Sequence, residues 1–581
     1  MNKPHLFLFT IGPVQSFIAQ ARKTQDLYTG SFILSYLIDK SMEKLKNQLN
    51  NKCDFIFPSQ NLKTKPNRFI AKIESNNIEQ LGNEIRKYTE DEFRSISYSI
   101  LSEIVNIPGN DFKNEFDKHI NSFLNIYWVA LPLGESNYEE IYGEIENYLG
   151  AVKNVRNFKQ INIIGHKCSL CGVRNGIFYK EPKRSFLFEH SVKLQGIPLR
   201  YLKKGENLCA IGFIKRFAGK KFDNYDSNFP SVSRIALLNV LNKINENALN
   251  KYKNYFLNSF NEELFYEENL TEKYFDDNNI PVEKLNDAKV KLDELKKLLP
   301  ENYKFGKYYA VLLMDGDDMG RWLSGEYLKD KTQLYNFHKF LSEKLGGFAD
   351  SVSKIVDDKI GKLVYSGGDD VLAFLNIHNI FPVIKKLRKS FPDFGIGSFD
   401  TEGKKSSASA GIVIAHYKTP LSEVIKAARN IEKEAKSIQD KNAWAIGVQK
   451  RSGGARLTVF KWGNKNSDLI DSCLYTLKVL KEKSFSNNFI RNLEIEFGHT
   501  LNNKHDNTES EIHMNELRRL ISRSCMLLRK DGESQQEYLE RKKREIKGLF
   551  SNLSHLYENS NSFSNFIDLL HIIDFIARGG N

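Results

Sequence analysis

Two short acidic turns, each next to an apolar run, constrain this chain most strongly. Residues 308–314 read YYAVLLM, which is typical of a buried strand, and they continue directly into DGDDMG at residues 315–320. Farther along, GGDD at residues 367–370 lies between the apolar runs 363–365 and 371–375. Apolar runs joined by a glycine turn predict a β-hairpin. A strand ending in aspartate, a helix, and a hairpin with carboxylates at its tip form the plan of a polymerase or nucleotide-cyclase palm.

The carboxylates predict a magnesium site. Adjacent aspartates repel each other unless a cation neutralises them, and Mg²⁺ prefers oxygen ligands that it shares with substrate phosphates. We expect Asp315, Asp369 and Asp370 to be catalytic ligands of two Mg²⁺ or Mn²⁺ ions. Such a pair of ions activates an attacking oxygen and stabilises a leaving one. Either motif alone is also compatible with an ordinary acidic turn, and their combination favours a nucleotide site.

Eight further residues are candidates for binding the nucleotide. The turn after Asp315 enters a predicted helix, whose N-terminal amides suit triphosphate oxygens. The glycines leave room for a large ligand, and a basic helix follows Pro420. The candidates are Gly316, Asp317, Asp318, Ser366, Gly367, Gly368, Lys433 and Lys436. For the two lysines, the alternative is a solvated helix face.

Composition limits the class of protein. The 581 residues suffice for roughly four domains, and a hydrophobic content of 41% argues against global disorder. A net charge of +13 favours a polyanionic partner. No apolar run approaches the roughly 18 residues of a membrane span, and the six cysteines are too scattered for a disulfide framework. We expect a cytoplasmic protein.

The order of strands and helices predicts an α+β fold with two ferredoxin-like, nucleotide-cyclase-like palm domains and helical domains between and after them. The expected domains are a first, degenerate palm at 1–165, a cysteine segment at 166–215, a helical domain at 216–300, a second palm with the GGDD site at 301–455 and a C-terminal helical domain at 456–581. The first domain has no carboxylate after its first strand, so we expect no catalysis from it.

The individual elements follow from apolar periodicity. In the first domain we expect strands at 6–11 and 126–131 and helices at 15–23 and 31–49. In the second palm we expect a strand at 308–314, a helix at 329–358, a hairpin at 362–375, a helix at 378–390, a strand at 408–415, a helix at 420–438 and a strand at 443–449. The two domains suggest a weak duplication of the palm.

These motifs resemble the large, palm-containing subunit of type III-B (Cmr) CRISPR–Cas effector complexes, in a form that lacks the HD nuclease domain. The resemblance rests on residues 11–24, 314–320, 366–370, 409–417 and 450–453. It implies two cyclase-like palms of which one is active, with other Cmr subunits, a guide CRISPR RNA and a target RNA as partners. It also implies that target RNA switches on the synthesis of cyclic oligoadenylate from ATP.

One departure from this family concerns the HD nuclease domain, which often precedes the first palm. Here the first palm begins almost at Met1. The pair His505 and Asp506 lies in a polar stretch without a nearby histidine cluster. We therefore expect no HD nuclease.

A second departure concerns zinc. Cys168 and Cys171 form a C-x-x-C half-site, in which two thiolates hold one tetrahedral ion. The family's second half-site is another C-x-x-C, but here Cys209 is followed by Gly212 in place of the fourth thiolate. We expect His166, or alternatively His190, to complete a zinc site. The other interpretation is a site that has lost its metal.

Competing functions remain open at this stage. The same metals would serve a conjugase that joins ATP to S-adenosylmethionine. A diguanylate cyclase fits less well, because Val371 follows GGDD where phenylalanine is usual. A catalytically silent RNA-binding scaffold is a different class, and the intact carboxylate set argues against it. The basic clusters 518–523 and 541–544 are candidates for contact with RNA, with a solvated helix face as the alternative.

Overall fold

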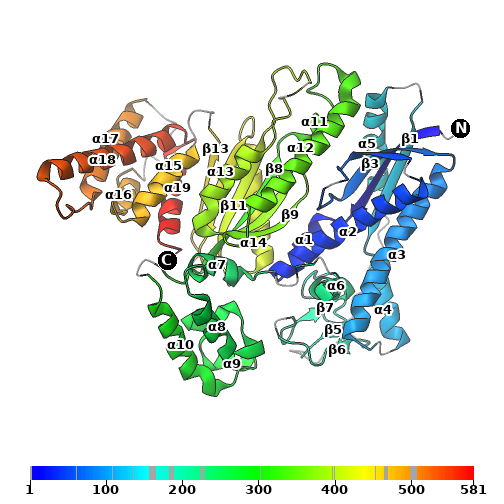
Figure 1. Ribbon diagram of the computed structural model, residues 1–581, viewed down its shortest axis with the longest axis horizontal. Coiled ribbons are helices and arrows are strands. Elements are labelled where there is room, and N and C mark those ends of the chain that lie inside the picture. Colours follow the sequence, from blue (N-terminus) through cyan, green and yellow to red (C-terminus); the bar gives the residue numbers. More distant parts are fainter. Residues whose placement is uncertain are drawn as a thin grey trace.

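A computed structural model describes residues 3–580, except residues 51, 61, 107–108, 135–136, 156–164, 182–188, 200, 221, 223–224, 227–228, 301–302, 396, 398, 452, 464–468 and 498–506. Two β-sheets stand side by side, the N-terminal one at the right of Figure 1 and the larger one at its centre. The C-terminal helices lie at the left, and two smaller units lie below the sheets. His505 and Asp506 lie outside the described residues.

The first palm is a βαββαβ unit with a four-stranded antiparallel sheet in the order β2-β3-β1-β4. Its strands are β1 (Lys3–Gly12), β2 (Cys53–Phe57), β3 (Arg68–Ser75) and β4 (Asn125–Pro132). Its helices are α1 (Gln15–Ala19), α2 (Thr24–Gln48), α3 (Ile78–Ile104), α4 (Asn110–Asn121) and α5 (Tyr138–Asn154). This strand order is that of a ferredoxin-like fold.

The second palm repeats this plan and extends it. Its strands are β8 (Tyr308–Gly316), β9 (Gly361–Ser366), β10 (Val371–Asn376), β11 (Ala408–His416), β12 (Ala443–Gln449) and β13 (Ala455–Lys461), and the sheet order is β13-β12-β11-β8-β10-β9. Its helices are α11 (Met319–Leu323), α12 (Leu334–Ile355), α13 (Ile380–Ser390) and α14 (Leu421–Ser437). The four strands β11-β8-β10-β9 match β4-β1-β3-β2 of the first palm, so the fold is an internal duplication.

The structure confirms most of the expected elements of both palms. Every strand and helix that was expected between residues 308 and 449 is present, with ends displaced by a few residues. In the first palm, the second helix begins at Thr24, seven residues earlier than expected. The pattern did not predict β2, β3, α3, α4 and α5, which complete the first palm. It also missed β13, an edge strand that continues the second sheet past residue 455.

The two palms exchange contacts across their interface. The first crossover helix of each palm lies against the edge strand of the other, because α12 packs on β2 and α2 packs on β9. At one of these contacts, Lys339 of α12 forms an ion pair of 2.7 Å with Asp54 of β2, which also accepts a hydrogen bond from Tyr335. Nearby, the Tyr138 hydroxyl lies 2.9 Å from Nδ1 of His338. The two palms therefore contact each other through equivalent elements, in an approximately two-fold arrangement.

Two smaller units connect the palms. The cysteine segment contains the short strands β5 (Phe178–Tyr179), β6 (Val192–Lys193) and β7 (Asn207–Leu208) and the helix α6 (Ala210–Phe217). The helical unit below the second palm in Figure 1 contains α7 (Val232–Leu241), α8 (Glu246–Tyr255), α9 (Glu272–Asp277) and α10 (Leu285–Lys297). A buried ion network fixes α6 to the start of α2, since Arg216 contacts Asp26 at 2.7 Å and Glu206 at 3.1 Å.

The C-terminal unit is a helical bundle docked on β13. Its helices are α15 (Leu469–Lys481), α16 (Asn488–Phe497), α17 (Asn507–Ser524), α18 (Gln535–Glu558) and α19 (Phe563–Ala577). Arg456 of β13 pairs with Asp568 at 2.6 Å and with Glu494 at 2.9 Å. The Asn565 side chain also bonds to the Val459 backbone at 2.8 and 2.9 Å. These contacts tie α16 and α19 to the edge of the second sheet.

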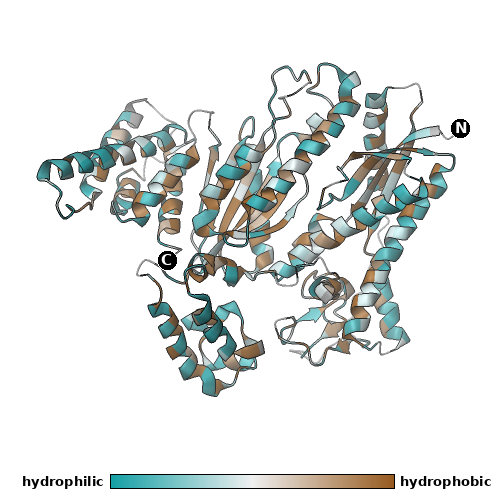
Figure 2. Ribbon diagram, in the orientation of Figure 1, coloured by the Kyte–Doolittle hydropathy of each residue, from teal (hydrophilic) through white to brown (hydrophobic). Residues whose placement is uncertain are grey.

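The distribution of hydrophobic residues follows this architecture. The strands of both sheets are mostly hydrophobic, whereas α17 and α18 are mostly hydrophilic (Figure 2). None of the described helices is both long and apolar enough to cross a membrane.

One glycine sets how closely α14 approaches the second sheet. A Cβ atom on Gly411 of β11 would lie 2.3 Å from the backbone nitrogen of Glu432 and 2.6 Å from its Cα. Only glycine allows this contact, because helix backbone cannot yield as a flexible side chain does.

We predict that Gly411→Ala destabilises the protein by about 1–3 kcal/mol, the usual cost of overpacking a tight contact. Urea unfolding followed by tryptophan fluorescence measures it, since Trp444 is buried on the neighbouring strand β12. Gly347→Ala in α12 is the matched control, because a Cβ there meets no atom within 4 Å. An equal stability of the two variants would contradict the proposed contact.

Candidate active site and cysteine cluster

The three predicted carboxylates gather at one edge of the second sheet. Met314 of β8 pairs with Val371 of β10, so one step farther along the two strands Asp315 faces Asp370. Asp369 lies beside Gly316, because a Cβ on that glycine would be 3.0 Å from the Asp369 Cβ. The strand register thus brings together residues that are 54 positions apart in the sequence (369 − 315).

The GGDD turn is a tight hairpin. The Gly367 amide donates to the Asp370 carbonyl at 3.0 Å and closes the turn between β9 and β10. Gly368 has a φ of +102°, which glycine adopts at little cost. At the end of β9, Ser366 is buried, and its hydroxyl has no hydrogen-bond partner among the described residues. The turn therefore presents Asp369 and Asp370 in a fixed geometry.

The two adjacent aspartates resist ionisation. Burial, followed by the charge of Asp370, raises the pKa of Asp369 to about 7. The side chain of Asp370 is more exposed, yet crowding by surrounding protein raises its pKa to about 6, against the opposing effect of Arg429. The raised pKa values show that the negative charges of these two carboxylates are not compensated by the protein. A bound cation would compensate them.

A lysine lies beside the third carboxylate. Lys436, in the last turn of α14, forms an ion pair with Asp315 and a second one with Glu432 at 3.1 Å. Burial and the nearby Lys441 lower the pKa of Lys436 to about 8 despite these two acids. The predicted residue Lys436 is thus part of the site, whereas Lys433, three residues earlier, is exposed to solvent.

Arg429 and Glu432 also belong to this site, although no sequence motif singled them out. Arg429 lowers the pKa of Asp370 and donates to the Gln15 carbonyl of α1 at 3.4 Å, which links α14 to the first palm. The charge of Asp370, after burial, raises the pKa of Glu432. Their helical spacing could have identified both residues, because positions 429, 432 and 436 share one face of the predicted helix.

Asp317 has an internal role. Its carboxylate accepts hydrogen bonds from Ser407 at 2.7 Å, from Ser409 at 2.8 Å and from the Asn442 amide at 3.0 Å. It is 3% exposed, so its acceptor positions are occupied by the protein. The Asp317 carboxylate therefore stabilises the turn after β8 instead of being free to bind a ligand.

The next residue, Asp318, is also held by a contact within the protein. Its carboxylate pairs with Lys441 at 2.6 Å, and its backbone has a φ of +54°. Residues 440, 441 and 442 also have positive φ values, between 48° and 59°. A run of three such residues without glycine is costly, and this turn supplies both the lysine for Asp318 and the amide for Asp317.

The carboxylates of Asp315, Asp369 and Asp370 could supply part of the coordination shell of magnesium. Asp315, Asp369 and Asp370 are not close enough to form a ready-made cluster, since the only group of three ligand side chains with all ligand atoms within 4.8 Å is elsewhere in the described structure. Mg²⁺ usually takes only one or two carboxylates and completes its shell with water and phosphate oxygens. The three carboxylates fit that pattern.

The first palm carries no such carboxylates at the same place. Thr10 of β1 pairs with Arg68 of β3, and the next residues, Ile11 and Asn67, are joined by a backbone hydrogen bond of 2.9 Å. Relative to the shared topology, they occupy the positions of Asp315 and Asp370. The duplicated fold therefore contains one acidic edge and one neutral edge.

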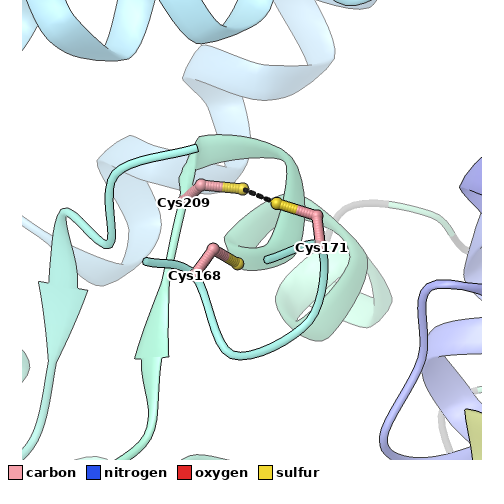
Figure 3. Close-up of side chains that lie close together, drawn as sticks. All are labelled: Cys168, Cys171 and Cys209. Atoms are coloured by element: carbon pink, nitrogen blue, oxygen red, sulfur yellow. Dashed lines mark hydrogen bonds between the residues drawn. The ribbon is translucent and has the colours of Figure 1, made fainter. Parts of the chain in front are cut away.

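The group within 4.8 Å is formed by three cysteines. Cys168, Cys171 and Cys209 point toward one another from the C-x-x-C loop and the start of α6 (Figure 3). The sulfurs of Cys171 and Cys209 are 3.9 Å apart. Hydrogen bonds from the other two thiols lower the pKa of Cys171, and the pKa values of Cys168 and Cys209 are raised in turn. Three cysteine sulfurs that lie this close together suit a cation that binds thiolates, such as Zn²⁺.

The structure does not bring a fourth protein ligand to this cluster within its described residues. The rings of His166 and His190 are not part of the group. At Gly212, a Cβ would lie 3.3 Å from the Cys168 sulfur. The position of the missing thiolate therefore adjoins the cluster.

The C-terminal basic clusters are partly engaged within the protein. Arg519 pairs with Glu516, and Arg541 pairs with Glu533 at 2.7 Å. The Arg518 guanidinium lies over the Phe550 ring at 4.4 Å. No single residue of these clusters stands out as a binding site for RNA.

The fold and the acidic edge together define a protein with paired palms of the nucleotide-cyclase type. Two family models match the sequence: CRISPR-associated protein Cmr2, N-terminal, at residues 6–149, and Cas10/Cmr2, second palm domain, at residues 308–445. These two matches, one in each palm, support a Cmr2-type subunit of a type III-B CRISPR system.

One curated relative is the CRISPR system Cmr subunit Cmr2 of Pyrococcus furiosus, at 27% identity. The alignment covers 80% of this chain and 63% of the relative, so the chain spans less than two thirds of that protein.

Two solved structures share the fold over nearly the whole chain. A chain of the type III-B Cmr-beta complex in its apo state has a TM-score of 0.67 at 15% identity, and 99% of this chain and 82% of that chain are covered. The same type of complex bound to cognate target RNA gives a TM-score of 0.62 at 15% identity, with 98% and 83% covered. At this identity the likeness concerns the fold alone.

Magnesium should stabilise the protein in a pH-dependent way. The raised pKa values of Asp369 and Asp370 mean that ionising them costs stability as the pH rises from the ordinary value of 3.8 to about 7. Mg²⁺ relieves this repulsion only when both groups are ionised. We predict that Mg²⁺ raises the melting temperature clearly at about pH 8 and little at about pH 5.5.

Thermal unfolding with and without Mg²⁺ measures this difference, and Asp369→Asn/Asp370→Asn is the matched variant. It keeps the shape of the turn and removes both charges, so the Mg²⁺ effect should vanish at either pH. A Mg²⁺ effect of equal size in wild type and variant would contradict the assignment.

We also predict that metal analysis finds about one zinc per chain, bound by the three cysteines. Cys171→Ser should lose it, because three thiolates with one external ligand are close to the minimum for tight binding. Cys53→Ser is the control, since Cys53 lies on β2 outside the cluster. A folded wild-type protein without zinc would show that the cluster holds no metal.

Proposed function

We propose that this chain is the large subunit of an RNA-guided type III-B effector complex, and that its second palm makes cyclic oligoadenylate from ATP when target RNA binds. The observation that carries the activity is the acidic edge, where the register of β8 and β10 sets Asp315 against Asp370 beside Asp369. The similarity of both palms to Cmr2 proteins supports the complex, the guide CRISPR RNA and the target RNA as partners. The six cysteines form no disulfide, which fits a reducing cytoplasm.

The reaction would be a nucleotidyl transfer between two ATP molecules. A 3′-hydroxyl oxygen of one attacks the α-phosphorus of the other, a new phosphodiester bond forms, and pyrophosphate leaves. Asp315, Asp369 and Asp370 would hold Mg²⁺, which supplies an activated hydroxyl and neutralises charge on the phosphates. Positioning and charge stabilisation account for most of such catalysis.

Cations on α14 supply the remaining charge. Lys436 is poised beside Asp315 and, with Arg429, lines the side of the site that α14 covers. If Asp315 held a metal ion instead of pairing with Lys436, the Lys436 ammonium group would be available to donate to a phosphate oxygen. Glu432 contacts Lys436 at 3.1 Å and restrains it. The hydroxyl of Ser366, buried and unpaired among the described residues, is a candidate for contact with a base or ribose.

The presence of two palms supports gating. One palm has the acidic edge and the other has Ile11 and Asn67 at the same positions. The exchanged packing of α2 and α12 makes the spacing of the two edges depend on the whole interface. A partner that shifts this interface would change the relative position of two bound nucleotides, which is how target RNA would control the rate.

We predict that Asp369→Ala/Asp370→Ala lowers nucleotide synthesis by at least about 1000-fold, because the removed charges act on the reacting phosphate. Assembly with the other subunits should persist, since both side chains lie in a surface turn. Asp276→Ala/Asp277→Ala in α9 removes a matched pair of exposed aspartates and should leave synthesis unchanged. Retained synthesis in the first variant would refute the site.

The gating is tested by comparing nucleotide products, by mass spectrometry, from the chain alone, the guide complex and the complex with complementary RNA. We predict product only, or mainly, in the third sample. Equal output in all three would contradict RNA control. A product that requires S-adenosylmethionine in addition to ATP would replace cyclic oligoadenylate by conjugation at the same carboxylates.

A further inference from the structure

The loop at residues 438–442, between α14 and β12, is strained and lies next to the acidic edge. Its residues Asp440, Lys441 and Asn442 have φ values of 59°, 48° and 50°. Residues other than glycine rarely adopt this left-handed conformation, and it persists only where the surrounding structure enforces it. Strain of this kind is concentrated at functional sites. The contacts that hold the loop therefore bear on the site.

The loop 438–442 joins two parts of the acidic edge. At its upstream end it leaves α14 directly after the turn that carries Lys436, the partner of Asp315. At its downstream end, the Asn442 amide donates to the Asp317 carboxylate at 3.0 Å. The position of the loop therefore determines both where Lys436 lies and how the turn after β8 is held.

Asn442 is held through its amide, its carbonyl and its side chain. Besides the bond from its amide to Asp317, its carbonyl accepts from the Trp462 amide at 3.2 Å. Its side-chain oxygen accepts from Nη2 of Arg388 at 3.0 Å. Arg388 thus supplies a side-chain contact to the residue whose amide holds Asp317.

The contact between Arg388 and Asn442 connects the two faces of the second sheet. Helix α13, which carries Arg388, packs into the hydrophobic core that contains Leu312 and Ile412. Helix α14 packs into the core that contains Val311 and Val413, on the opposite face. The loop after α14 is therefore fixed from the far side of the sheet by one arginine.

The surroundings of Arg388 do not favour a charged side chain for packing alone. Arg388 lies in the last turn of α13, next to the buried residue Leu387. Its Nε is buried and has no hydrogen-bond partner within the described part of the chain, which costs stability. Burial lowers the pKa of Arg388, and the negative charges of Asp317 and Asp393 oppose this decrease. The bond to Asn442 and the attraction to Asp317 are what the guanidinium contributes.

We propose that Arg388 is a positioning residue of the acidic edge: through Asn442 it fixes the loop 438–442, and the loop fixes the turn after β8 and places Lys436 against Asp315. Its effect on the reaction rests on the proposed function, whereas the link itself rests on the contacts. A planar guanidinium directs its hydrogen bonds more strictly than an ammonium group does. A displacement of about 1 Å at reacting groups can lower a rate about 100-fold.

The first test measures nucleotide synthesis by the complex with target RNA. For Arg388→Ala we expect kcat to fall about 10- to 100-fold, with a smaller change in KM for ATP, because misplaced groups act on the reacting atoms. Arg388→Lys should fall between this variant and wild type, because it keeps the charge but not the planar donors. Lys389→Ala, at an exposed position of the same helix, is the matched control and should equal wild type.

Two further readouts distinguish positioning from a general loss of structure. Guanidinium ion at about 50 mM, far below the molar concentrations that unfold proteins, should restore much of the kcat of Arg388→Ala, whereas ammonium ion should not. Asn442→Gly keeps the backbone amide and tolerates the positive φ, but removes the acceptor of Arg388. The double variant should be no slower than Arg388→Ala, because both changes remove the same contact. Multiplied losses, or no rescue by guanidinium, would overturn the proposal.

Hydrogen exchange on the full chain tests the link without any catalysis. In Arg388→Ala, amides in the peptide that covers residues 438–446 should exchange at least about tenfold faster than in wild type or Lys389→Ala. If wild type makes no nucleotide yet this difference is found, the proposed activity fails and the link stands. If wild type makes nucleotide while Arg388→Ala matches it in rate and exchange, the positioning role fails alone.

Discussion

The close approach of α14 to β11 is the constraint on which the site depends. Gly411 lets the helix backbone at Glu432 reach the sheet. Lys436 lies one helical turn after Glu432, beside Asp315. Arg429 lies about one turn before Glu432, near Asp370. A side chain at position 411 would push the helix outward and move all three charged groups. The electrostatics of the acidic edge are therefore set by a packing contact made by an uncharged residue.

The palm is duplicated in this chain, but only the second copy has an acidic edge. Both palms have the same strand order, and both have backbone pairing that ends at the same place. Ile11 and Asn67 replace the pair Asp315 and Asp370. The first palm thus retains the fold and the interface without the charge. Each palm supplies the helix that covers the edge strand of the other, so neither has the same surroundings alone.

The sequence predicted the second palm well because its signals are local. The runs around residues 308–314 and 371–375 are continuous and apolar, and the acidic turns mark their ends. The strands β2, β3 and β13 were missed because they are short or mix polar and apolar residues. The carboxylates of the acidic edge could be proposed from the motifs, but the hydrogen bonds that hold Asp317 come from Ser407, Ser409 and Asn442, which are distant in sequence. No local pattern encodes such contacts.

A crystal structure with Mn²⁺ and a non-hydrolysable ATP analogue, with the metal located by its anomalous scattering, would test the acidic edge most directly. We expect metal next to Asp315, Asp369 and Asp370 in the second palm, with the triphosphate beside it and Lys436 displaced from Asp315. We expect no metal beside Ile11 and Asn67 in the first palm. Metal absent from the acidic edge, or bound only in the first palm, would show that these carboxylates do not form the nucleotide site.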